Sequence, residues 1–218
     1  AVYEYDAEGI LPEAMLNCLV RLGWASGDQE IFSREELVKL FSLKNLGKSA
    51  SVFDREKLLW LNQHYIKESA VARLAGLLEG VLAGRGFTNL DKAYLEAFIP
   101  LLQPRSRTLV EMADQAQMFV AEAPEMDAQA AAKFLTEDVL PHLAALRAIF
   151  AQAPAFEQEP LEAAAKAYLD EKGLKFKTVA QPLRVALTGR TASPGLFEMM
   201  QAMGRERVLA RLDRVQAK

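Results

Sequence analysis

The sequence predicts an all-α protein made of two packed helical subdomains. Hydrophobic residues make up 51% of the 218 residues, and alanine and leucine outnumber the β-branched types, which favours helices over strands. Apolar residues recur at helical spacing along most of the chain, and no long stretch has the alternation expected of a strand. A chain of this length can bury a substantial core.

Composition argues against several classes of function. The single cysteine, Cys18, cannot form an internal disulfide, and with only His64 and His142 present a cysteine–histidine metal site is not expected. No apolar run is long enough to span a membrane, and the N-terminus has no signal-peptide pattern. We therefore expect a cytoplasmic protein without a membrane partner.

Positive charge is concentrated at the C-terminal end. The net charge is −3, which argues against indiscriminate nucleic-acid binding. Residues 171–218, however, contain ten lysines and arginines against four acids. Nucleic-acid-binding proteins have such an asymmetry, and so do many solvated helices, so charge alone leaves both interpretations open.

The first predicted helix opens at Pro12, in the first turn where proline is tolerated, and ends at Gly23. The spacing of its apolar residues predicts a buried face. That face comprises Leu11, Met15, Leu16, Leu19 and Leu22. The residues before it, 1–8, suggest no partner segment, and a first residue other than methionine is typical of a fragment of a longer protein.

Capping residues predict the starts of two further helices. Ser33 and Glu36 have the spacing of a capping box, in which each side chain binds the other residue's amide. After a loop over 44–51, Asp54 is expected to cap a helix that runs to about Glu68.

The middle of the chain contains arginines beside a predicted helix start. Helices are expected over 69–83 and from about residue 90, and Pro104 must end the second of these. Thr108 and Glu111 form another predicted capping box. Arg105 and Arg107 lie just before it, and without further evidence they are best interpreted as solvated side chains.

The C-terminal part is predicted to contain five helices. The first three cover about 128–135, 137–150 and 160–171, and residues 175–179 are expected to be an extended lead-in. Residues 181–214 then predict a helix closed by Gly189 and a second helix. That second helix is expected to open at Ser193 and Pro194, with a hydroxyl cap and a proline in the first turn.

No catalytic motif is present. The sequence contains no glycine-rich phosphate loop, no nucleophile elbow and no metal-spaced cluster. His64 stands at no motif spacing from a serine, a cysteine or a paired acid, so a role as general base has little support. We therefore expect this chain to be non-catalytic on its own. The loop over 188–193 lies against a predicted helix N-terminus, which suits a polar or anionic ligand.

Three groups of residues, taken together, resemble bacterial glutamyl-tRNA synthetases. The groups follow the family's order and span nearly the whole chain, except for residues 69–90. They are residues 9–17, 22–24 and 27–33; Ser49, 53–54 and 57–66; and PLRVALTG (182–189) with SPGLFE (193–198). The family's two ATP-site motifs, of the HIGH and KMSKS types, lie upstream of what this sequence contains.

The resemblance implies the C-terminal portion of such an enzyme, a class I aminoacyl-tRNA synthetase. Residues 1–68 would be the helical end of the stem-contact region, and 69–127 and 128–218 two subdomains of an anticodon-binding helical cage. The implied partner is glutamate tRNA, and the implied state is a monomer. ATP and Mg²⁺ would serve the full-length enzyme, and no cofactor is expected in this portion.

The resemblance also implies roles for particular residues. Arg105 matches the arginine that reads cytosine at the third anticodon position, where a rigid guanidinium suits the acceptor atoms of cytosine. Arg184 matches an arginine that contacts anticodon bases. The residues that match a cradle for the first anticodon base are Ser193, Pro194 and Leu196. From charge alone, we add four arginines as contacts to the RNA backbone: Arg107, Arg190, Arg205 and Arg207.

An alternative class of function stays open at this point. A helical protein–protein docking module would have the same amphipathic helices, with solvated arginines and an incidental charge asymmetry. Binding to glutamate tRNA, compared with a tRNA altered in the anticodon, distinguishes the two hypotheses.

Overall fold

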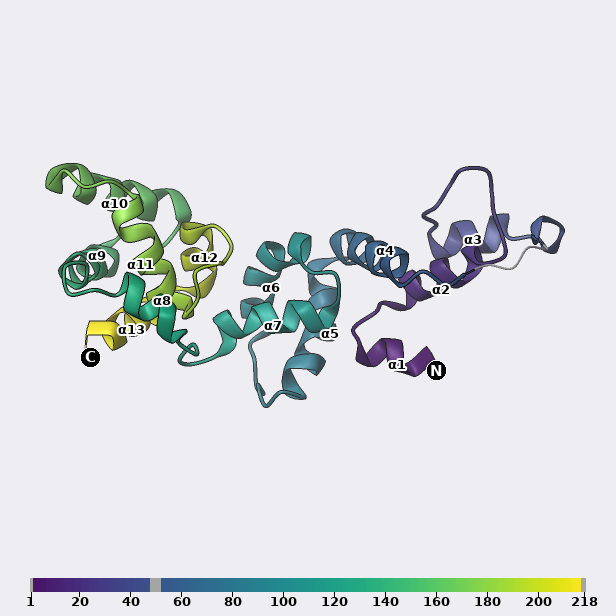
Figure 1. Ribbon diagram of the computed structural model, residues 1–218, viewed down its shortest axis with the longest axis horizontal. Helices are drawn as coiled ribbons and strands as arrows, with labels where there is room; N and C mark the ends of the chain where they lie inside the picture. Colours follow the sequence, from purple (N-terminus) through teal and green to yellow (C-terminus); the bar gives the residue numbers. More distant parts are fainter. Residues whose placement is uncertain (1, 48–51, 217–218) are drawn as a thin grey trace. The chain divides into compact units, whose positions relative to one another are not determined.

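The protein is helical throughout the part that the structure describes. The computed structural model describes residues 2–47 and 52–216, and in these ranges it contains helices but no strand (Figure 1). Two isolated bridges, Trp24 with Leu46 and Ser26 with Gln29, are the extended pairings found there. The all-α prediction is confirmed. Part of the predicted 44–51 loop, residues 48–51 with Ser49, lies outside the described residues.

The chain forms two compact units. The first contains Ala1–Thr88 and Leu102–Gln115, and the second contains Asn89–Leu101 and Ala116–Lys218. The chain therefore passes from one unit to the other three times: between Thr88 and Asn89, and inside the helices α6 (Lys92–Leu102) and α7 (Leu109–Val120). The boundaries expected from the sequence, after residues 68 and 127, remain a proposal.

The first unit is built mainly from five helices and two short 3₁₀ turns. The helices are α1 (Val2–Ala7), α2 (Pro12–Arg21), α3 (Arg34–Leu40), α4 (Arg55–Glu68) and α5 (Val71–Ala83). The 3₁₀ turns are η1 (Leu43–Asn45) and η2 (Gln103–Arg105). Helix α1 is not anticipated by the sequence, because it is short and buries none of its residues.

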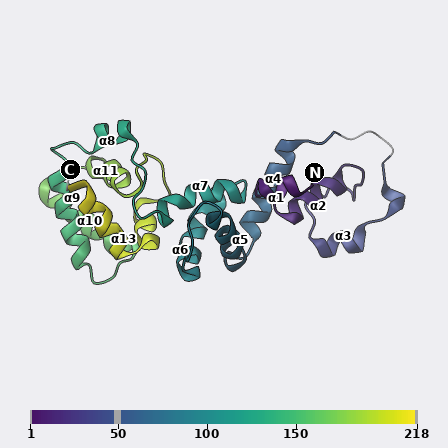
Figure 2. The ribbon, with the colours of Figure 1, turned by 90° about the horizontal axis from the view of Figure 1, so that it is seen from below.

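The second unit contains six further helices. They are α8 (Ala128–Phe134), α9 (Leu140–Gln152), α10 (Gln158–Lys172), α11 (Lys177–Thr188), α12 (Leu196–Met203) and α13 (Arg205–Gln216). Helix α9 contacts both α10 and α13, and Figure 2 shows the three together. None of the described helices is both long and apolar enough to cross a membrane.

One part of the core of the first unit lies between α2 and α4. Ala14, Met15 and Cys18 of α2 pack in one buried cluster with Leu58 and Leu61 of α4. Burial raises the pKa of the Cys18 thiol, which acts as a small packing residue.

The face predicted for α2 is partly wrong. Leu11 and Met15 are buried, but Leu16 and Leu19 are 41% and 45% exposed. The buried stripe runs through alanine and cysteine instead, because these small side chains allow α4 to approach. Leucine spacing alone could not reveal that choice.

Helix-start signals are the most successful predictions. Ser33 and Glu36 make both bonds of a capping box, and the Asp54 carboxylate accepts from the amides of Glu56 and Lys57. Thr108 Oγ1 accepts from Glu111 N at 3.0 Å as predicted.

Two C-terminal predictions are wrong. Residues 177–179 are not extended, since α11 begins at Lys177. The single helix expected after Ser193 is two helices, α12 and α13, separated at Gly204 with φ 83°. A glycine in this conformation interrupts a helix that the apolar spacing would otherwise continue.

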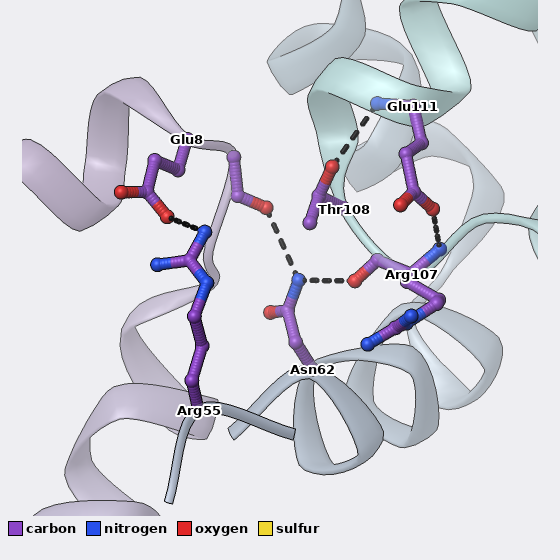
Figure 3. Close-up of polar contacts among 7 residues, drawn as sticks. Glu8, Arg55, Asn62, Arg107, Thr108 and Glu111 are labelled. Atoms are coloured by element: carbon purple, nitrogen blue, oxygen red, sulfur yellow. Dashed lines mark hydrogen bonds and ion pairs between the residues drawn. The ribbon is translucent and has the colours of Figure 1, made fainter. Parts of the chain in front are cut away.

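Asn62 connects three segments of the first unit (Figure 3). Its fully buried amide accepts a bond from Leu11 N at 2.7 Å and donates to Gly9 O at 3.1 Å and Arg107 O at 2.7 Å. Leu109 N also donates to Gly9 O at 3.0 Å. Residues about fifty positions away on either side of Asn62 are therefore joined through one side chain.

We predict that Asn62→Leu lowers the free energy of unfolding of the first unit by about 2–4 kcal/mol, because buried main-chain groups lose their partner. Both tryptophans, Trp24 and Trp60, lie in this unit, so urea unfolding followed by tryptophan fluorescence measures its stability. Gln29, whose amide bonds are exposed, supplies the control: Gln29→Leu should change stability by about 0.5 kcal/mol or less. Equal losses in the two variants would contradict the role of Asn62.

Candidate nucleic-acid interface

Arg105 is the last residue of the 3₁₀ turn η2, and its side chain is exposed. The turn is held against the end of α4. Gln63 Nε2 donates to Pro104 O at 3.3 Å, and the buried amide of Gln103 binds carbonyl groups at the C-terminal end of the helix. Arg105 therefore belongs to a segment with a defined main-chain position.

The residues that follow Arg105 are also fixed (Figure 3). Arg107 N donates to the Glu111 carboxylate at 2.7 Å, and Arg107 O accepts from Asn62. The predicted capping box is thus shifted: the return bond of Glu111 goes to the amide of Arg107 rather than to that of Thr108. The shifted bond fixes the main chain two residues after the exposed Arg105.

The Arg107 side chain has a partner within the protein. Its guanidinium forms an ion pair with Glu56 at 2.8 Å, and about 38% of the side chain is exposed. A second pair of the same unit, Arg55 with Glu8 at 2.7 Å, lies close by in Figure 3. Exposed ion pairs are weak, so Arg107 is able to exchange Glu56 for a phosphate at little cost.

The second group of predicted site residues lies in the loop between α11 and α12. The guanidinium of Arg184 donates to Ser193 Oγ and, at 2.9 Å, to Pro194 O. Pro194 and Leu196 are buried, whereas Ser193 is partly exposed. The structure therefore brings Arg184, Ser193 and Pro194 into direct contact.

The prediction that Ser193 caps the next helix is wrong. Helix α12 begins at Leu196 with Gly195 as its N-cap, and no side-chain hydrogen bond caps it. Ser193 Oγ instead donates to Pro194 O at 2.8 Å and accepts from Arg184. The Glu198 carboxylate lies over the Gly195 backbone, so the N-terminus of the helix already faces an acidic group.

Gly189 determines where this loop begins. It has φ 73°, and a Cβ placed on it would lie 2.0 Å from Glu125 O. Asp127 N donates to Gly189 O at 3.0 Å, and Thr188 Oγ1 donates to Arg184 O at 2.8 Å. Only glycine permits the segment around residue 125 to approach so closely.

The C-terminal arginines are mostly used inside the protein. Arg211 is 1% exposed and donates to Met118 O, Leu187 O and Ala121 O at 2.5–2.6 Å. Burial lowers the pKa of its guanidinium to about 10, so it stays charged at neutral pH. This part of the positive C-terminal charge therefore serves the fold.

Two of the arginines predicted to contact the RNA backbone are similarly engaged. Arg205 donates to Ala151 O at 2.9 Å and to Ala153 O, at the end of α9. The Arg207 guanidinium lies 4.3 Å from the centre of the Tyr94 ring. Burial raises the pKa of Tyr94, although Arg207 and Arg211 oppose that shift.

Arg190 differs from these arginines. Its side chain is exposed and makes no hydrogen bond or ion pair within the described residues. Together with Thr188, Gln117 and Glu125, it lines a hollow of about 140 Å³ beside the loop. Among the four arginines proposed from charge alone, Arg190 is the one whose cation is most available to a ligand.

Three residues that hold the main chain near the predicted site residues were not expected from the sequence. Gln103, Asn62 and Arg211 are buried polar side chains bound to main-chain groups distant in sequence. One signal could have pointed to this role. Asn62 is a polar residue at an apolar position of its helix, between Leu61 and Ile66.

Two family models match the chain. The anticodon binding domain matches residues 63–216, which include every predicted site residue. The catalytic domain of class I tRNA synthetases (E and Q) matches residues 1–60.

Curated relatives confirm the predicted resemblance. A glutamate–tRNA ligase of Syntrophobacter fumaroxidans is 49% identical over 98% of this chain and 46% of its own length. That of Geobacter sulfurreducens is 48% identical over 100% of the chain and 47% of its own length. The chain thus spans about half the length of the curated relatives it matches.

Solved structures of glutamate–tRNA ligases also match this chain. A crystal structure of a glutamate tRNA ligase from Elizabethkingia meningosepticum, in complex with its amino acid, superposes with a TM-score of 0.87 at 26% identity. The match covers 98% of this chain and 42% of that one. A glutamate–tRNA synthetase from Elizabethkingia anophelis has a TM-score of 0.82 at 27% identity, with the same two coverages.

We predict that Gly189→Ala displaces the loop and lowers the free energy of unfolding by about 3 kcal/mol or more, since backbone strain adds to a collision with main-chain atoms. Gly173 provides a matched control. It has φ 63° but nothing within 4 Å of an added Cβ, so Gly173→Ala should cost about 1 kcal/mol. Hydrogen exchange of the amides near residues 125–127 and 188–193 measures both variants. Similar exchange in the two would contradict the importance of the close approach.

Proposed function

This chain belongs to the anticodon-binding-domain family, and we propose that it is the part of a glutamate–tRNA ligase that recognises the tRNA anticodon. The observation that carries the proposal is the family match over residues 63–216, the segment that contains all nine predicted RNA-contacting residues. The relatives named above are glutamate–tRNA ligases, which supports glutamate tRNA as the partner.

Arg105 is the proposed reader of the third anticodon base. An exposed guanidinium on a fixed 3₁₀ turn suits this role, because discrimination between bases requires donors at a defined position. Cytosine presents a ring nitrogen and a carbonyl oxygen as acceptors, which a planar guanidinium fork can bind together.

The proposed cradle for the first anticodon base consists of Ser193, Pro194 and Leu196, with Arg184 beside it. The bonds of Arg184 to Ser193 and Pro194 O support a preformed loop, in which one guanidinium organises the cradle and also faces the RNA. Single-stranded bases are commonly read by stacking and by hydrogen bonds from such loops.

The four remaining arginines are proposed to contact the RNA backbone, and they differ in how far their guanidinium groups are already bound within the protein. Arg190 is exposed and available, and Arg107 can exchange a weak ion pair. Arg205 already binds the end of helix α9, and Arg207 already packs on the Tyr94 ring. These two arginines would contact phosphate only through N–H groups that the existing contacts do not use.

The activity of the longer enzyme is also part of the proposal. The chain spans about half the length of its relatives, and residues 1–60 match a catalytic-domain family model. We propose that a complete protein attaches glutamate to its tRNA using ATP and Mg²⁺, as a cytoplasmic monomer. This chain would contribute recognition of the tRNA rather than chemistry.

A direct test is filter binding of the chain to glutamate tRNA and to the same tRNA with an altered anticodon. We expect preference for the unaltered tRNA, with an affinity that falls steeply as salt rises, because phosphate contacts release counterions. Equal binding to both, or no binding, would favour a protein–protein docking module instead.

Arg105→Gln should relax discrimination at the third anticodon base, at a cost of about 1–3 kcal/mol if the contact is bidentate. The measurement compares affinities for tRNAs that carry cytosine or uracil at that position. Arg34, an exposed arginine of the same unit at the start of α3, supplies the control variant Arg34→Gln, which should leave the preference intact. An unchanged preference in Arg105→Gln would refute the role of Arg105.

A further inference from the structure

Gln103 makes an unusual set of contacts two residues before Arg105. Its side chain is 9% exposed, and its Nε2 lies 2.8 Å from Ile66 O, 2.9 Å from Lys67 O and 2.9 Å from Ser69 O. These carbonyls belong to the last turn of α4 and its C-cap, where a helix has few main-chain donors: Ser69 N donates to Ile66 O at 3.2 Å. One amide thus supplies the end of α4 with hydrogen-bond donors.

The same amide determines the position of the η2 turn. Gln103 is the first residue of the turn and Arg105 the last, so a displacement of the Gln103 main chain moves the base-reading arginine with it. Gln63 of α4 adds a bond to Pro104 O, and Ser106 Oγ donates to Leu102 O at 2.9 Å. Beyond the turn, Asn62 and Glu111 bind the main chain of Arg107.

Of these attachments, that of Gln103 is the one that joins η2 to α4 by buried side-chain bonds. The buried bond of Ser106 closes the turn on itself, from its C-cap to its N-cap. The bond from Gln63 is exposed and longer, and those of Asn62 and Glu111 act two residues after Arg105. Loss of the Gln103 amide would also leave the carbonyls of Ile66, Lys67 and Ser69 without a donor that they have now.

We propose that Gln103 is a positioning residue for Arg105, which fixes the η2 turn by binding the C-terminal carbonyls of α4. The inference rests on the proposed role of Arg105 as a base reader. Gln103 touches no RNA in this proposal. It determines specificity through another residue, because a guanidinium displaced by about 1 Å loses the geometry of a bidentate contact.

The test is Gln103→Met in the whole chain, since methionine has a similar length but no donor. Two quantities are measured: the ratio of affinities for tRNAs with cytosine and uracil at the third anticodon position, and the hydrogen exchange of the amides of residues 105–107. We expect the ratio to fall about tenfold, affinity for the uracil tRNA to change little, and exchange to accelerate. A purely structural role lowers both affinities together and leaves the ratio unchanged, which would overturn the proposal, as would unaltered exchange.

Asn17 supplies a matched control for lost stability. Its buried amide binds Glu30 O, Phe32 N and the Tyr65 hydroxyl in the same unit, and none of these belongs to the η2 turn. Asn17→Ser should lower stability and preserve the ratio, and an equal fall in the ratio would overturn the proposal. If Gln103→Met does not fold, Gln63→Leu removes a weaker bond to the same turn. A smaller fall in the affinity ratio then supports the proposal, and an unchanged ratio overturns it.

Arg105→Gln measured in parallel separates two kinds of failure. If that variant keeps the cytosine preference, the base-reading role is wrong and the positioning role falls with it. If Arg105→Gln relaxes the preference while Gln103→Met keeps it, only the positioning role of Gln103 is wrong.

Discussion

Helix-end carbonyl groups need donors, and much of this structure depends on how that need is met. An all-helical chain has many helix ends, and each end leaves main-chain groups without intrahelical partners. Here long polar side chains from distant segments fill several of these positions: Gln103 at the end of α4, Arg205 at the end of α9, and Arg211 at the ends of α7 and α11. Buried amides and guanidinium groups therefore connect helices that apolar packing alone would leave free to slide.

This use of polar side chains changes the meaning of the positive C-terminal charge. Arg205 and Arg211 neutralise helix ends. The Arg214 guanidinium donates to both the main-chain carbonyl and the carboxylate of Glu122. The charge asymmetry of the sequence is consequently a poor measure of affinity for RNA. The proposed recognition of RNA depends instead on a few individual side chains, above all the exposed guanidinium groups of Arg105 and Arg190.

Both proposed base-reading elements are short irregular segments attached to rigid ones. The Arg105 turn is fixed to α4, and the loop between α11 and α12 begins at Gly189, whose backbone lies against that of residue 125. A reader whose main chain is already ordered loses little entropy on binding, so more of its hydrogen-bond energy is available to distinguish one base from another. In the proposed function, the buried polar side chains thus contribute to specificity as well as to stability.

The sequence by itself determined the helical class, most helix starts and the identity of the family, because capping residues, glycines and short motifs act locally. Ser33, Asp54 and Gly189 behave as their local chemistry requires. Local rules failed where a distant segment decided the outcome. Ala14 and Cys18 replace Leu16 and Leu19 in the core because α4 packs there, and Ser193 binds Arg184 instead of capping a helix. Tertiary structure alone decided which main-chain groups Asn62, Gln103 and Arg211 bind, since their partners lie some 24 to 93 residues away along the chain and only folding brings a donor to those carbonyls.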